Sequence, residues 1–117
     1  MPTTVRVIES YTASNPDPLK ARAGETLLPG KRDDEWPGWI WCSDPRGKTA
    51  WVHEDLLLLF PDHAVLQKDY DAVELTAAAD EILTALREVG GWLWCENARG
   101  ETGWIPQRNT ETVADAH

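Results

Sequence analysis

The sequence contains few of the residues that carry out chemistry. It has only two cysteines and three histidines among its 117 residues. His53, His63 and His117 are far apart in sequence, and neither cysteine lies near a plausible general base. No zinc-ligand spacing, nucleotide-binding loop or catalytic motif occurs. We therefore expect a protein that is not an enzyme and has no resident cofactor.

Long hydrophobic runs are also missing. The apolar stretch Leu56 to Phe60 is far shorter than the roughly 18 residues that a membrane span needs. The opening residues, Met1 to Thr4, lack the basic and apolar regions of a signal peptide. These absences predict a cytoplasmic protein that does not act at a membrane.

Basic residues are scarce. The chain has 11 Lys and Arg against 20 Asp and Glu, a net charge of −9. Residues 1–60 carry 9 acids and 7 bases, giving −2, whereas residues 61–117 carry 11 acids and 4 bases, giving −7. Nucleic acid and anionic membranes need basic surfaces, so both are excluded as expected partners. The acidic balance suits a basic peptide, a cation, or a basic partner protein that an acidic face inhibits or escorts.

A repeated tryptophan motif is the main feature that is present. Trp39-Ile40-Trp41-Cys42 recurs as Trp92-Leu93-Trp94-Cys95, with an offset of 92 − 39 = 53. The same offset relates Gly47 to Gly100 and Trp51-Val52 to Trp104-Ile105. A period of about 50 residues indicates two copies of one structural unit.

Each copy predicts a hairpin. Side chains alternate between the faces of a strand, so each cysteine shares a face with Ile40 or Leu93. Glycine supplies the positive φ that the following tight turn needs. We expect Cys42 and Cys95 to be buried and reduced, and at least half of the seven tryptophans to fill cores.

The chain therefore divides into two expected barrels, residues 3–60 and 63–110, joined by Pro61-Asp62 with no flexible linker. We expect the barrels to pack against each other. Residues 5–11 predict a first strand, and His53 to Asp55 one helical turn. The stretch Leu75 to Glu88 has helical propensity, but its alignment with the first copy predicts a strand. Residues 110–117 are expected to fray.

The ordered set of motifs resembles the Src-homology-3 (SH3) family, twice. In that family an aromatic strand, an acidic loop, Gly-Glu, a Trp strand, a Gly hairpin and a Gly-Tyr-Ile-Pro turn follow in order. The first copy matches through Tyr11, Leu19, Gly24-Glu25, Trp39, Cys42 and Trp51-Val52; the second matches through Tyr70, Leu75, Glu81, Trp92, Cys95 and Gly103 to Pro106. The resemblance implies an all-β chain of two tandem, five-stranded, partly open SH3-like barrels.

The resemblance also implies a non-catalytic protein-interaction or peptide-interaction module. In the family, extended proline-containing peptides lie in an aromatic groove, and a basic ligand residue pairs with a loop carboxylate. The second copy offers Tyr70, Glu74, Trp92, Trp104 and Pro106 for such a groove, and the first offers Tyr11, Trp39 and Trp51. The copies depart from the family at His53, which replaces the Pro, and at Leu56 and Asn109, which replace the last groove Tyr.

Calcium binding is an alternative from a different class. Carboxylates are the hard oxygen ligands that calcium prefers, although the sequence has no calcium-loop consensus. The candidate ligands are paired acids: Asp33, Asp34, Glu35, Glu54, Asp55, Asp80 and Glu81.

Overall fold

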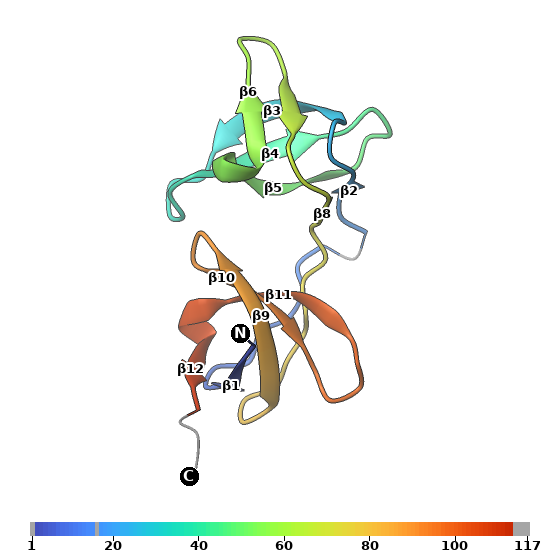
Figure 1. Cartoon of the computed structure of the whole chain (residues 1–117). Helices are drawn as coiled ribbons and strands as arrows, with labels where there is room; N and C mark the ends of the chain where they lie inside the picture. Colours follow the sequence, from blue (N-terminus) through green and yellow to red (C-terminus); the bar gives the residue numbers. More distant parts are fainter. Residues whose placement is uncertain (1, 16, 114–117) are drawn as a thin grey trace. The chain divides into compact units, whose positions relative to one another are not determined.

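The computed structural model describes residues 2–15 and 17–113 as an all-β protein with two short 3-10 turns (Figure 1). The chain forms two compact units. Unit 1 comprises Met1–Asn15 and Glu74–His117, and unit 2 comprises Pro16–Val73. Among the described residues, no helix is long and apolar enough to cross a bilayer.

Unit 2 contains an antiparallel five-stranded sheet in the order β5-β4-β3-β7-β6. The strands are β3 (Thr26–Arg32), β4 (Trp39–Ser43), β5 (Thr49–His53), β6 (Leu57–Leu59) and β7 (Ala64–Leu66), with η1 (Glu54–Leu56) before β6. A separate short pair joins β2 (Lys20–Ala21) to β8 (Tyr70–Asp71). The expected helical turn near His53 is therefore confirmed as η1.

Unit 1 contains a second five-stranded sheet in the order β11-β10-β9-β1-β12. Its strands are β1 (Thr3–Val7), β9 (Ile82–Val89), β10 (Trp92–Glu96), β11 (Thr102–Pro106) and β12 (Thr110–Thr112), with η2 (Gln107–Asn109) before β12. The strand prediction for the alanine-rich segment is confirmed by β9. The expectation of fraying is wrong for residues 110–112, which pair with β1, and residues 114–117 lie outside the described part.

The first strands of the two repeats are exchanged between the units. β1 opens the first repeat, yet it pairs with β9 and β12 of the second, with Val5 opposite Leu83. β7 opens the second repeat, yet it pairs with β3 and β6 of the first, with Leu27 opposite Ala64. The sequence-based division into barrels of residues 3–60 and 63–110 therefore differs from the compact units, each of which takes strands from both repeats.

The short connection between the repeats explains this exchange. The Phe60 N–H donates to the His63 carbonyl at 2.9 Å, so Pro61 and Asp62 lie in a tight turn that joins β6 to β7 as neighbours. A hairpin of this length keeps both strands in one sheet. β7 also presents Ala64 and Leu66 to the core, as β1 presents Val5 and Val7, so either strand offers two inward apolar side chains.

The cysteines occupy equivalent core positions. Cys42 and Cys95 are fully buried and free, on the faces of β4 and β10 that carry Ile40 and Leu93. Burial raises the pKa of each thiol to about 11, since the thiolate would be poorly solvated there. The expectation of buried, reduced cysteines is confirmed.

Candidate functional site

Each tryptophan hairpin carries a row of side chains on the face opposite its cysteine. In unit 1, Trp92 lies across from Pro106 and Trp94 across from Trp104. The Trp94 and Trp104 rings meet edge to face, with 5.3 Å between centroids. Cross-strand aromatic pairs of this kind stabilise an antiparallel sheet. The predicted site residues Trp92, Trp104 and Pro106 are therefore brought onto one face.

Unit 1 adds a tyrosine from the first repeat to this row. Tyr11 exchanges two 2.9 Å backbone hydrogen bonds with Ala77, and its ring lies 5.8 Å from the Trp92 ring at 80°. Both rings are partly exposed. The aromatic surface of unit 1, which we define as Tyr11 and Trp92 with the buried Pro106 as support, thus combines residues that the sequence assigned to different copies.

Glu74 lies beside this surface and is tightly held. Its Oε1 atom accepts hydrogen bonds from the Ser14 backbone N–H at 2.7 Å and the Ser14 hydroxyl at 2.8 Å. Burial, together with the charge and hydrogen bonding of Glu74, raises the pKa of Tyr11. One carboxylate oxygen of Glu74 therefore serves the fold, and its role as a charge partner for a ligand stays a prediction.

Trp104 supports the surface from within the sheet. Its side chain is only 3% exposed, and its carbonyl accepts a 2.9 Å hydrogen bond from the Leu75 N–H. The Arg87 guanidinium lies over the outer tryptophan pair, 5.6 Å from the Trp94 ring centroid and 5.5 Å from that of Trp104. Trp104 is thus placed as a buried support rather than as an open contact residue.

The corresponding row in unit 2 contains Trp39, Trp41, Trp51 and His53. Trp39 is buried and packs edge to face on His53, with 5.2 Å between ring centroids. The Tyr70 hydroxyl donates to the Trp51 carbonyl at 2.9 Å, so Tyr70 belongs with the first repeat's tryptophans and not with Trp92. Trp39 and Tyr70, the counterparts of Trp92 and Tyr11, are both buried, so unit 2 has no equivalent of the partly exposed pair of unit 1 among the described residues.

The acids proposed as calcium ligands are not gathered into one site. Glu54 pairs with Arg32 at 3.1 Å, Asp80 forms an ion pair with Arg6, and Glu81 accepts a hydrogen bond from the Ala78 N–H at 3.1 Å. Asp33 accepts a hydrogen bond from the Glu35 N–H within their own loop. Within residues 2–15 and 17–113, no three side chains of the types that bind metals lie close enough to hold an ion. The geometry therefore gives the calcium alternative no support.

Sequence reasoning missed Ser14 and Asn109. The buried Asn109 side chain donates to the Glu9 carbonyl at 3.2 Å and the Ser10 carbonyl at 3.4 Å, which fixes the segment leading to Tyr11. The hydrogen bonds of Ser14 and Asn109 both connect the segment after β1, the strand that unit 1 takes from the first repeat, to the rest of unit 1. The only indication in the sequence is that Asn109 stands where the SH3 family has its last groove Tyr. This replacement does not indicate which residues Asn109 contacts.

The comparisons with known proteins give one positive result. A family model described as variant SH3 domain matches the chain twice, over residues 4–60 and residues 63–112. The searches of curated proteins and of solved structures found no match. The two matched segments follow the sequence repeats, whereas the compact units exchange the first strand of each.

Proposed function

Because the chain belongs to the variant SH3 domain family, which is present in two copies, we propose that it is a non-catalytic module that binds an extended peptide of a partner protein on the aromatic surface of unit 1. SH3-like domains are, in general, protein-interaction modules. The observation that carries the proposal is the edge-to-face contact of Tyr11 with Trp92. These partly exposed rings, supported by the buried Pro106 across from Trp92, form the kind of floor on which extended peptides lie.

The ligand in this proposal is basic as well as extended. The net charge of −9 favours a positively charged partner and disfavours nucleic acid and anionic membranes. Glu74 supports the same choice, because its carboxylate, which Ser14 holds in place, lies next to the Tyr11 side chain. A proline-containing peptide with a flanking Arg or Lys combines the apolar and the charged requirement.

The proposal involves no cofactor and places the protein in the cytoplasm. Two free cysteines in a chain of this size suit a reducing compartment. The buried thiols have raised pKa values and are poor nucleophiles, which supports a binding role over a catalytic one.

The experiment is a screen of a proline-containing peptide library with the full chain, followed by calorimetry on the best ligand. We expect Trp92→Ala to cost about 2 kcal/mol or more of binding free energy, since aromatic anchors dominate such interfaces. Tyr11→Ala should weaken binding as well, and Glu74→Gln should cost at most about 1 kcal/mol and reduce the salt dependence.

The matched control is Leu58→Ala, which removes an exposed apolar side chain of unit 2 and should leave the affinity unchanged. If Trp92→Ala binds like the parent chain while Leu58→Ala does not, the ligand lies elsewhere and the proposal fails. Far-ultraviolet circular dichroism of each variant separates lost binding from lost folding.

A further inference from the structure

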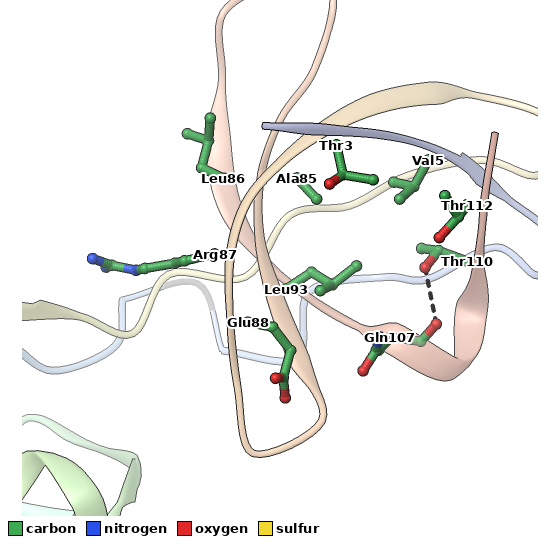
Figure 2. Close-up of a pocket in the computed structure, with 10 residues that line it drawn as sticks. All are labelled: Thr3, Val5, Ala85, Leu86, Arg87, Glu88, Leu93, Gln107, Thr110 and Thr112. Carbon is green, nitrogen blue, oxygen red and sulfur yellow. Dashed lines mark hydrogen bonds between the residues drawn. The ribbon is translucent and has the colours of Figure 1, made fainter. Parts of the chain in front are cut away.

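Unit 1 contains a hollow lined by residues of β1, β9, β10, η2 and β12. Its volume is about 340 Å³. Val5, Ala85 and Leu93 make an apolar floor, and the hydroxyls of Thr110 and Thr112 stand at the rim (Figure 2). Leu93 faces the core, whereas its neighbour Trp92 faces the other side of β10, so the hollow is separate from the proposed peptide surface.

A β-bulge places a carboxylate in this hollow. The register of β9 against β10 shifts between Trp94, which lies opposite Arg87, and Cys95, which lies opposite Ala85. One extra residue in β9 therefore resets the alternation of side chains. As a result Glu88 lies opposite Leu93 and lines the hollow with it, while Arg87 points away (Figure 2).

The corresponding positions in unit 2 carry a different pair of side chains. Ile40 corresponds to Leu93, and the residue opposite it is Arg32. Arg32 pairs with Glu54, the first residue of η1, at 3.1 Å. In unit 1 the corresponding residues are Glu88 and Gln107, the first residue of η2. Unit 2 thus carries a cation and an anion at these positions, and unit 1 carries an anion and a neutral amide.

Glu88 has little to balance its charge. Its Oε2 atom accepts one hydrogen bond, from the Gly91 N–H at 2.8 Å. Among residues 2–15 and 17–113, no Lys, Arg or His forms an ion pair with it. Figure 2 shows the Glu88 carboxylate and the Gln107 side chain on the same side of the hollow, below Leu93. A carboxylate, an amide and hydroxyls above an apolar floor suit a cationic head on an aliphatic stem.

We propose that this hollow binds an arginine side chain of a partner protein, which supplies a cation beside Glu88 as Arg32 supplies one beside Glu54 in unit 2. The aliphatic stem lies on Leu93 and Val5, and the guanidinium donates hydrogen bonds to the Glu88 carboxylate. Arginine fits better than lysine because its planar head donates two parallel hydrogen bonds to one carboxylate.

The test titrates the full chain with N-acetyl-arginine amide as the probe. Binding is followed through the backbone amide shifts in nuclear magnetic resonance spectra. We expect saturable shifts at Glu88, Leu93, Gln107 and Thr110. The neutral isostere N-acetyl-citrulline amide should bind about fivefold more weakly or worse, the factor expected for a partly exposed ion pair. Equal binding of the two compounds, or no saturable shift with either, would overturn the proposal.

Three variants test whether arginine binding depends on the Glu88 carboxylate. Glu88→Gln should weaken arginine binding about fivefold, and Glu96→Gln, which removes the same charge outside the hollow, should leave it unchanged. The double change Glu88→Arg with Gln107→Glu copies the pair of unit 2 and should abolish binding in a folded chain. Equal effects of Glu88→Gln and Glu96→Gln would overturn the proposal. Trp92→Ala should not alter this titration, so failure here is distinguishable from failure of the peptide surface.

Discussion

The Glu74 carboxylate accepts two hydrogen bonds from Ser14, a residue 60 positions earlier in the chain. Ser14 follows the first strand of the first repeat, and Glu74 lies in the loop of the second repeat. Their contact closes unit 1 across the point where the repeats exchange strands. A single carboxylate thereby links the fold of unit 1 to the aromatic surface that we propose as its binding site.

The first prediction concerns this contact. Ser14→Ala removes the hydroxyl donor and keeps the backbone donor, so it should lower the free energy of unfolding by about 1 kcal/mol. Urea unfolding followed by tryptophan fluorescence measures the change. Thr12→Ala is the control, since Thr12 is an exposed residue of the same segment. An equal loss for both variants would show that the bond from Ser14 to Glu74 contributes nothing.

The second prediction concerns the exchanged strands. A protease site placed between Pro61 and Asp62 gives fragments of residues 1–61 and 62–117. Each unit contains strands from both fragments, so the nicked chain should elute as one species in native size-exclusion chromatography. The fragments should separate only in denaturant. Two independently folded fragments that part in native buffer would instead indicate sequential barrels.

Gly103 provides a third test. A Cβ atom there would lie 2.8 Å from the Glu74 carbonyl carbon and 2.8 Å from the Leu75 backbone nitrogen. Gly103→Ala should therefore destabilise the chain by about 1–3 kcal/mol, as overpacking against backbone does. The equivalent residue of unit 2 is Ala50, and Ala50→Gly should cost less than about 1 kcal/mol. Thermal unfolding of both variants checks this order, and the reverse order would contradict it.

The fourth prediction concerns pH. Burial opposes ionisation of Asp44, but hydrogen bonds from the Lys48 N–H and from Arg46 prevail and hold the pKa of Asp44 below its ordinary value of 3.8. A lowered folded-state pKa adds stability above pH 3.8 that is lost as the pH falls through the folded value. We expect acid to destabilise unit 2 in that range.

The matched variant is Asp44→Asn, because Asn97 holds the equivalent turn of unit 1 through the Arg99 and Glu101 N–H groups, each at 3.0 Å. The variant should keep the backbone hydrogen bonds but lose the ion pair with Arg46, which should lower the free energy of unfolding at neutral pH by about 1–2 kcal/mol. Its free energy of unfolding should also fall less steeply as the pH drops. Unfolding followed by circular dichroism between pH 2 and 7 measures both effects. An unchanged acid limb would assign the acid sensitivity to other carboxylates.

The sequence by itself determined the local structure. The 53-residue offset, the alternation around Cys42 and Cys95, and the turn glycines depend on neighbours within a few residues, and strand periodicity and turn chemistry act at that range. These signals predicted the two hairpins, the buried thiols and the family. They also placed Trp92, Trp104 and Pro106 on one face, because strand pairing carries them there.

Only the tertiary structure decided which strands complete which barrel. β1 and β7 present similar apolar pairs, Val5 with Val7 and Ala64 with Leu66, so the side-chain pattern fits either core. The turn at Pro61-Asp62 favours β7 beside β6, and β1 then completes the other sheet. This strand arrangement places the Tyr11 ring against Trp92 and the Tyr70 hydroxyl against the Trp51 carbonyl. The sequence near each tyrosine does not specify its partner, so the partner is the residue that the strand topology brings next to it.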